Sequence, residues 1–168
     1  MCLIWQYIEQ NRSLNVPVML RVPEYPNIAV KLERKFDLIN GLALTKINDL
    51  SEMSTLGLAH VGDAVFELMV RTWLCTNGVH TAKNLHGAAV ALVSAKAQAD
   101  AAELIFPMLC ESEAAIFKRG RNASTNSSPK SCSGREYQAA TALEALFGYL
   151  YLKCEFNRLN ELFGKVVE

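Results

Sequence analysis

Residues 55–75 are apolar at most positions, and their polar side chains fall on one narrow stripe of a predicted helix. The stripe consists of His60, Asp63, Glu67 and Arg71, which follow one another at steps of three, four and four residues. A helix that is apolar on almost every side is expected in the middle of a fold. Its acids then need partners, because an unpaired buried carboxylate is costly.

Residues 137–152 repeat this arrangement. Their polar stripe consists of Gln138, Thr141, Glu144 and Gly148 in a segment otherwise filled with Ala, Leu, Phe and Tyr. If the two stripes pack together, Asp63 and Glu144 lie side by side, and such close like charges repel unless a proton or a cation intervenes. A hydrated Mg²⁺ ion prefers oxygen ligands of this kind. A metal ion held there can activate water and stabilise a phosphoryl transition state.

Periodicity alone leaves a structural interpretation of these acids open. Asp63 could bond to the backbone or to Arg71, and Glu144 could face solvent. For Glu67 an ion pair with Arg71 is expected, because the two lie four residues apart in the favourable order.

From Ser51 onward the pattern is helical. Ser51 or Ser54 is expected to cap the first helix, and Asn77-Gly78 to end it. Further helices are predicted from Thr81 or Asn84 to Pro107 with a break at Ser94, over 111–120, from about Arg135 to Lys153, and at the C-terminus. The fold class is therefore predicted to be all-α.

Residues 1–48 differ from this helical part. The stretch "VPVMLRVPEYPNIAV" contains three prolines and suits an extended or irregular segment. We therefore predict a helical domain at 49–168, preceded at 1–48 by an extension that is either irregular or the product of a mis-assigned start.

Composition and charge narrow the range of functions. The chain of 168 residues is 51% hydrophobic with a formal net charge of zero, which argues for a globular fold and against uniform electrostatic binding. The five cysteines lack the paired spacing of a zinc site and favour reduced thiols in a cytoplasmic protein. The apolar start is too short for a membrane span and lacks the basic flank of a signal peptide.

Two stretches resemble the catalytic domain of the ribonuclease III family. The segment "LGLAHVGDAVFELMVR" is similar to that family's signature metal-binding helix, and "ATALEALFGYLYL" resembles its second acidic helix. Three further segments resemble the Mini-ribonuclease III branch, which has no double-stranded RNA-binding domain: "NLHGAAVALVSAKAQA", "FKRGRNA" with a downstream "PK", and "YQAATALEALFGYLYL". The resemblance covers roughly residues 49–165 and is specific in both order and spacing.

The resemblance assigns roles residue by residue. Asp63 matches the family's essential aspartate and Glu144 its metal-binding glutamate, so both are expected to be catalytic and to bind Mg²⁺. The larger family carries carboxylates at the positions of Ala59 and Thr141, whereas the Mini-ribonuclease III branch lacks both. His60 stands where the branch usually has tyrosine, at a position that contributes to the dimer contact in the larger family.

The resemblance also implies a substrate and an assembly. It implies a homodimeric endoribonuclease that cleaves both strands of duplex RNA and leaves 5′-phosphate ends. The substrate of the branch is precursor 23S ribosomal RNA, with a ribosomal protein as a possible cofactor. A catalytically weak or inactive dimer that only binds duplex RNA is the alternative, motivated by Ala59 and Thr141. A helical dimerisation domain without an RNA role is a third.

The basic residues that follow position 117 suit RNA contacts. Lys118, Arg119, Arg121 and Lys130 lie in and after "FKRGRNA" in a stretch without acids, and Lys96 lies in the branch motif "VSAKAQA". A-form RNA is recognised largely by its shape and backbone, so scattered basic residues are expected to contact phosphates. The alternative is that a charged helix end and loop are merely solvated.

Overall fold

The computed structural model describes residues 18–22, 25–32, 38–39, 42–43, 50, 53–78, 81–123 and 132–168. The chain divides into two compact units, Met1–Thr45 and Lys46–Glu168. Residues 44–49 lie outside the described ranges, so the predicted boundary at residue 48 stays a prediction.

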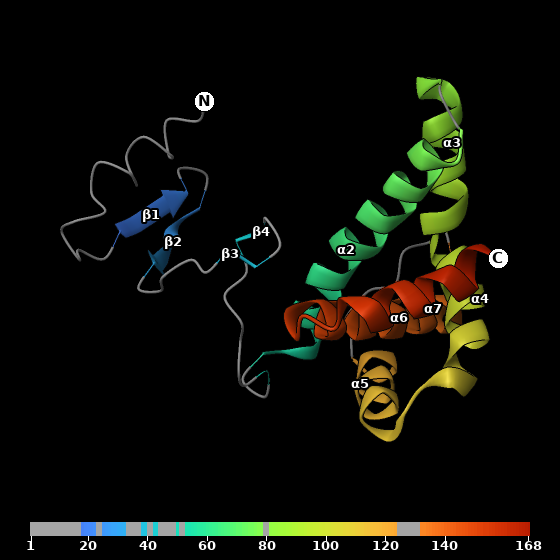
Figure 1. Ribbon diagram of the computed structural model, residues 1–168. Helices are drawn as coiled ribbons and strands as arrows, with labels where there is room; N and C mark the ends of the chain where they lie inside the picture. The colour runs from blue at the N-terminus through green and yellow to red at the C-terminus, as the bar shows by residue number, and fades with distance from the viewer. Residues whose placement is uncertain are drawn as a thin grey trace. The chain divides into compact units, whose positions relative to one another are not determined.

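The first unit contains two short antiparallel strand pairs (Figure 1). Strand β1 (Val18–Val22) pairs with β2 (Tyr25–Leu32), and β3 (Leu38–Ile39) pairs with β4 (Leu42–Ala43). The register of the first pair shifts between Arg21 and Val22. Strands β1 and β2 lie in the proline-rich segment that was predicted to be extended or irregular, and their antiparallel pairing was not indicated by the sequence.

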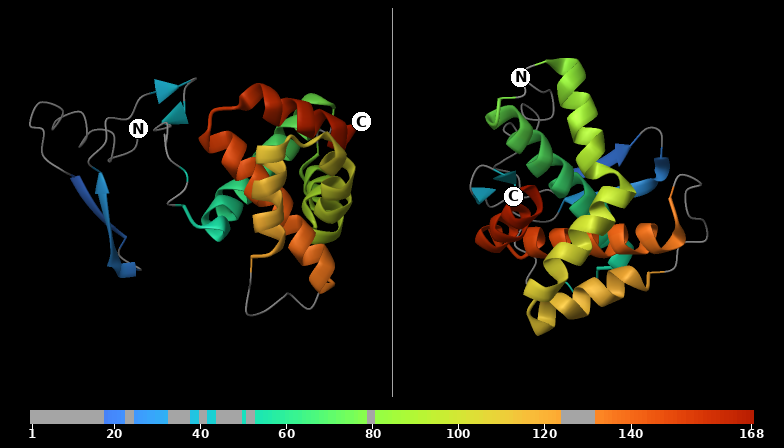
Figure 2. Two further views of the ribbon diagram at one scale, coloured as in Figure 1. Left: turned by 90° about the horizontal axis from the view of Figure 1, so that it is seen from below. Right: turned by 90° about the vertical axis from the view of Figure 1, so that its right-hand side faces the viewer.

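The second unit is all-α in its described residues, which confirms the predicted fold class. Its helices are α2 (Thr55–Thr76), α3 (Ala82–Val93), α4 (Ala95–Ile105), the 3₁₀ helix η1 (Phe106–Met108), α5 (Glu111–Arg121), α6 (Gly134–Leu152) and α7 (Phe156–Val167). Helix α6 contacts α2, α4, α5 and α7 and runs through the middle of the unit (Figure 2). None of the described helices is both long and apolar enough to cross a membrane.

Short polar side chains cap the helices as the sequence indicates. The hydroxyl of Ser54 accepts a hydrogen bond from the Gly57 N–H at 3.0 Å, and Thr81 caps α3 in the same way. Ser94 ends α3 and caps α4, which confirms the predicted break. Ser133 and Glu136 form a reciprocal capping box at the start of α6.

The core of the unit forms where α2 and α6 meet. Phe66 and Phe147 are fully buried, with ring centroids 5.3 Å apart in an edge-to-face arrangement. Phe163 of α7 adds a second edge-to-face contact to Phe66 at 5.9 Å. These three rings fix the relative positions of the helices that carry the predicted acids.

Two glycines allow the backbones of α2 and α6 to touch. A Cβ atom added to Gly62 would lie 1.7 Å from the carbonyl oxygen of Glu144, and one added to Gly148 would lie 2.0 Å from that of Leu58. No side chain fits at either position without moving a helix. The absent side chain of Gly62 therefore makes room for helix α6.

A partly buried ion pair joins α5 to α7. Arg158 donates from Nε to Glu113 Oε1 at 2.9 Å and from a terminal nitrogen to Glu113 Oε2 at 3.0 Å. The same guanidinium donates to the carbonyl oxygen of Met108 at 2.6 Å, while Glu113 accepts from the Cys110 N–H at 2.9 Å. The pair thus satisfies polar groups at the start of α5 and anchors α7 against it.

Candidate active site

The close crossing of α2 and α6 brings the two predicted acids to one place. Gly62, the neighbour of Asp63 in the chain, faces the backbone of Glu144. Asp63 is exposed, Glu144 is half-buried, and the negative charge of Asp63 acts on Glu144. Asp63 and Glu144 therefore lie near each other at the crossing, as predicted, whereas His60 and Arg71 of the same stripe are exposed, so the two stripes do not pack together along their length.

The environment of Glu144 disfavours its ionised form. Burial, and secondarily the charge of Asp63, raise the pKa of Glu144 to about 7, whereas a hydrogen bond from the Gln98 side chain opposes that rise. At neutral pH the protonated and ionised forms of the Glu144 carboxyl group are therefore both populated. A cation placed between the two acids would favour the ionised form, since it would offset both the burial and the repulsion.

Gln98 is a residue of this site that sequence reasoning missed. It lies on α4, is 3% exposed, and its amide reaches the Glu144 carboxylate. A signal for it was present, because Gln98, Ala102 and Ile105 form a core-facing stripe at helical spacing on which only Gln98 is polar. A buried amide on such a stripe needs a polar partner.

Ala59 and Thr141, which stand where the resemblance places carboxylates in the larger family, supply no carboxylate to this site. Ala59 is buried, and Thr141 is buried with its hydroxyl donating to the Tyr137 carbonyl oxygen at 3.0 Å. Among the described residues no three His, Cys, Asp or Glu side chains gather into a metal site. Two carboxylates are still a suitable donor set for Mg²⁺, which keeps several waters and is commonly held by one or two carboxylates.

The remaining acid of the polar stripe has a different role. Glu67 accepts a hydrogen bond from Arg71 Nε at 3.1 Å and forms an ion pair with the same guanidinium. This confirms the predicted intrahelical pair. Arg71 is therefore engaged by Glu67, and the alternative partner suggested for Asp63 is already occupied.

The predicted RNA-binding residues that the structure describes lie on α4 and at the end of α5. Lys118 and Arg121 are exposed at the end of α5, and Arg119 there donates to the Thr55 hydroxyl at 3.3 Å. Lys96 is exposed on α4, while Lys130 lies outside the described residues.

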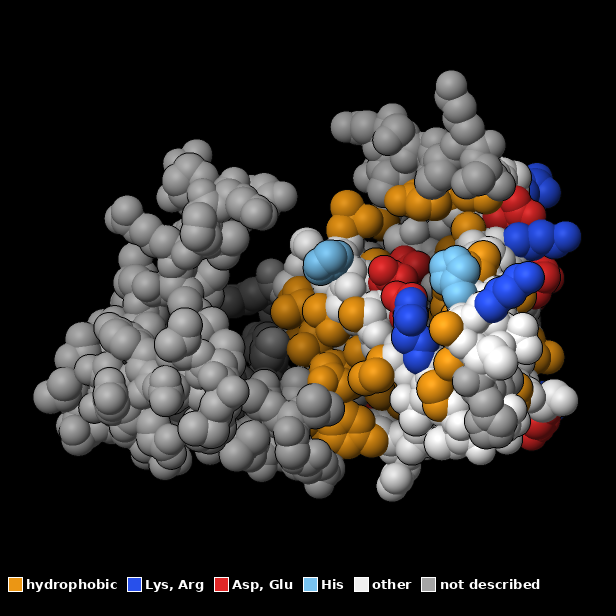
Figure 3. Space-filling model, turned by 90° about the horizontal axis from the view of Figure 1, so that it is seen from above, with side chains coloured by type: hydrophobic (Ala, Val, Ile, Leu, Met, Phe, Trp, Pro, Cys, Tyr) orange, Lys and Arg blue, Asp and Glu red, His pale blue; other side chains and the backbone are white. Residues whose placement is uncertain are grey.

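The surroundings of Lys96 connect it to the start of α6. Hydrogen bonds from Ser133, and then the positive charge of Lys96, lower the pKa of Glu136. Figure 3 shows a face of the helical unit on which acidic and basic side chains gather beside exposed hydrophobic ones. This mixture of charges is consistent with the neutral total charge of the chain.

Comparison with known proteins agrees with this geometry. The Ribonuclease III domain family matches residues 56–155. The Mini-ribonuclease 3 of Thermoanaerobacter sp. (strain X514) is 44% identical over 128 residues, which cover 74% of this chain and 89% of that protein. The Mini-ribonuclease 3 of Clostridium tetani is 41% identical over 120 residues, covering 71% and 80% of the two chains.

A solved structure has the same fold. The crystal structure of protein FN1578 from Fusobacterium nucleatum superposes with a TM-score of 0.65 at 34% sequence identity. The match covers 72% of this chain and 97% of that one. Asp63 and Glu144 both fall inside the segment that matches the family.

Proposed function

This chain is an endoribonuclease of the ribonuclease III family, which acts on double-stranded RNA, and we propose that Asp63 and Glu144 form its Mg²⁺-dependent active site. The observation that carries the proposal is the meeting of these two acids at the α2–α6 crossing, where burial and repulsion raise the pKa of Glu144 to about 7. Such a pair of acids suits a divalent cation better than it suits solvent alone.

The residues of the crossing have separate tasks in this proposal. Asp63 is exposed and supplies one oxygen ligand, whereas Glu144 supplies a second ligand whose ionisation is coupled to cation binding. Gln98 holds the Glu144 carboxylate from the buried side. When bound, Mg²⁺ supplies the charge that polarises a phosphate and lowers the pKa of a water molecule.

Basic side chains position the duplex in the same proposal. Lys118, Arg119 and Arg121 at the end of α5, together with Lys96 and Lys130, contact RNA phosphates. These contacts are insensitive to sequence, and the affinity should fall steeply as salt is added.

The proposed assembly is a homodimer that matures precursor 23S ribosomal RNA, with a ribosomal protein as a possible cofactor. Leu56 and Leu68 of α2 are large apolar side chains with 44% and 57% of their surface exposed. Burial of such side chains against a second copy of the chain would stabilise a dimer. The substrate and the cofactor rest on the similarity to Mini-ribonuclease 3 proteins.

The test is cleavage of a structured 23S precursor RNA in Mg²⁺ by the full-length protein. Asp63→Asn should abolish product while leaving the circular-dichroism spectrum unchanged and the melting temperature no lower, because Asp63 is exposed and its charge opposes that of Glu144. Glu67→Gln, which removes an acid one turn away on the same stripe, is the matched control and should retain activity.

Two outcomes would count against the proposal. Full activity in Asp63→Asn would remove Asp63 from the active site. Tight duplex binding without Mg²⁺-dependent product, over a range of duplexes, would favour the inactive duplex-binding alternative.

A further inference from the structure

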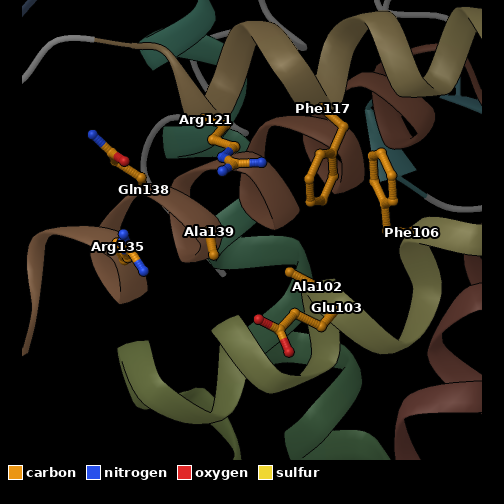
Figure 4. Close-up of a pocket in the computed structure, with 8 residues that line it drawn as sticks. All are labelled: Ala102, Glu103, Phe106, Phe117, Arg121, Arg135, Gln138 and Ala139. Atoms are coloured by element: carbon orange, nitrogen blue, oxygen red, sulfur yellow. The ribbon is translucent and has the colours of Figure 1, made fainter.

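A cavity of about 550 Å³ lies between α4, η1, α5 and α6 (Figure 4). Its volume is in the range of small-molecule binding sites. Neither Asp63 nor Glu144 lines it, and no residue of α2 does. The cavity is therefore separate from the carboxylate site, and the proposed reaction leaves it without a role.

Two phenylalanine rings form one end of the cavity. Figure 4 shows Phe106 and Phe117 side by side, and their ring centroids lie 5.2 Å apart. Phe117 is 5% exposed and holds its partner in place, whereas Phe106 is 42% exposed. An exposed ring supported from behind is a stacking surface for a flat aromatic ligand.

Charged side chains from three helices face the same space. Arg121 comes from the end of α5, Arg135 from the first turn of α6, and Glu103 from α4. Within the described residues none of the three forms an ion pair. Two guanidinium groups face one carboxylate, so the cavity is positively charged and has donors available for an anion.

We propose that this cavity binds one unpaired nucleotide of the RNA substrate, with its base against Phe106 and its phosphate between Arg121 and Arg135. Proteins recognise single-stranded RNA by stacking bases on aromatic side chains and by hydrogen-bonding their edges. Gln138 and Glu103 line the cavity and provide donors and acceptors for a base edge. The inference rests on the proposed function, because an RNA substrate must reach this face.

A peptide with an aromatic residue and a carboxylate could meet some of the same groups. The nucleotide is favoured because Arg121 belongs both to the cavity and to the basic end of α5, next to Lys118 and Arg119. A strand whose phosphates contact that helix end is adjacent to the cavity. An unpaired nucleotide in that strand would place its base in the cavity by rotating out of the helix.

The first experiment titrates the full-length protein with 5′-AMP, adenosine and inorganic phosphate by calorimetry. AMP should bind at least about tenfold more tightly than adenosine or inorganic phosphate alone, because stacking and phosphate contacts act together. Phe106→Ala and Arg135→Ala should each weaken AMP binding by about tenfold. Both side chains are exposed, so the melting temperature should change little.

Arg119→Ala is the matched control for these variants. It removes the same charge as Arg135→Ala, here from the end of α5 next to Arg121, but its side chain donates to Thr55 and does not line the cavity. AMP affinity should be unchanged in this variant. An equal loss of affinity in Arg119→Ala would show a diffuse electrostatic effect and overturn the assignment.

Three other results would also overturn it. One is phosphate binding as tight as that of AMP and insensitive to Phe106→Ala, which would identify an anion site only. Another is no AMP binding at about 10 mM, weaker than the millimolar affinity expected of a specific site. The third is tighter binding of an acidic peptide ending in phenylalanine than of AMP, which would assign the cavity to a protein partner.

A second experiment separates this inference from the proposed function. Binding and cleavage are compared for a fully paired duplex and for the same duplex with one bulged adenosine. We expect about tenfold tighter binding of the bulged duplex, and loss of that preference in Phe106→Ala and Arg135→Ala. If both duplexes are cleaved without preference for the bulged one, and AMP does not bind, the inference about the cavity would be wrong while the proposed reaction would stand. AMP binding through these residues without any cleavage would support the cavity and overturn the proposed reaction.

Discussion

Glu144 and Glu113 belong to the same helical unit, and their surroundings shift the two pKa values in opposite directions. Glu144 on α6 meets Asp63, so burial and repulsion raise its pKa to about 7. Glu113 on α5 is 6% exposed and meets Arg158, whose hydrogen bonds lower its pKa despite the burial. A buried acid with a cationic partner stabilises the fold, whereas one facing another acid holds a local charge conflict that a bound cation can relieve.

The largest expected effect is on activity. Glu144→Gln should lower kcat/KM for Mg²⁺-dependent duplex cleavage by about a thousandfold or more, because an amide cannot replace the charged ligand. Glu113→Gln should leave kcat/KM within about threefold of the wild type, since its hydrogen-bond partners, Cys110 and Arg158, lie at the start of α5 and on α7. The measurement is single-turnover cleavage at 20 °C. Equal losses in both variants would show that the comparison is wrong.

The free energy of unfolding should fall in Glu113→Gln, the variant that leaves activity nearly unchanged. Glu113→Gln should lower the free energy of unfolding by about 2–3 kcal/mol, because it leaves the Arg158 guanidinium partly buried without its main partner. Glu161→Gln is the matched control: it removes the other partner of Arg158, at 2.8 Å and more exposed, and should cost less than about 1 kcal/mol. Urea denaturation measures both values. A smaller loss in Glu113→Gln than in Glu161→Gln would contradict the assignment.

The two acids should also differ in their pH dependence. Between pH 4.5 and 7 folded Glu144 binds a proton that the unfolded chain has released, so the free energy of unfolding falls as the pH rises, by up to about 3 kcal/mol. For Glu113 the pKa is lower in the folded state, so its stabilisation is present above pH 4.5 and is lost as the pH falls.

Denaturation in EDTA at a series of pH values tests these signs. The decline between pH 4.5 and 7 should be absent from Glu144→Gln, and the loss below pH 4.5 should be smaller in Glu113→Gln. Saturating Mg²⁺ should reduce the difference between wild type and Glu144→Gln at pH 8, because a ligand bound only to the folded state stabilises it. An unchanged slope in EDTA for Glu144→Gln would contradict the raised pKa.

Some contacts of the acidic residues could be predicted from the sequence, and others could not. The Glu67–Arg71 pair was predictable because helical spacing fixes which residues meet within one helix. The meeting of Asp63 and Glu144 followed from two matching polar stripes and from the family resemblance. The Glu113–Arg158 pair joins residues 45 positions apart on different helices, and no local pattern indicates it.

The same limit applies to the cavity and to the strands of the first unit. The cavity depends on where the ends of α4, α5 and α6 lie in space, which periodicity does not determine. The β1–β2 hairpin lies in a proline-rich segment for which the sequence indicated only an extended or irregular backbone. The sequence thus predicts helices and the faces that they bury, while contacts between distant side chains depend on tertiary packing.

The smallest expected effect concerns Gln98, which sequence reasoning missed and which touches the acid with the raised pKa. Gln98→Leu replaces the amide on α4 with an apolar side chain of similar size and so removes the donor that favours ionised Glu144. The pKa of Glu144 should therefore rise further. The acid limb of the pH–rate profile should move upward by about one pH unit, with activity near that of the wild type at pH 9.

Thr141→Val is the control, because the Thr141 hydroxyl is buried on the same helix as Glu144, three residues before it, but bonds to its own helix. It should leave the acid limb in place. A simple packing role for Gln98 would lower the melting temperature and the activity equally at every pH, without moving that limb. A shift confined to Gln98→Leu would instead show that this amide sets the ionisation of Glu144, and that the charge conflict at the crossing is tuned by a third helix.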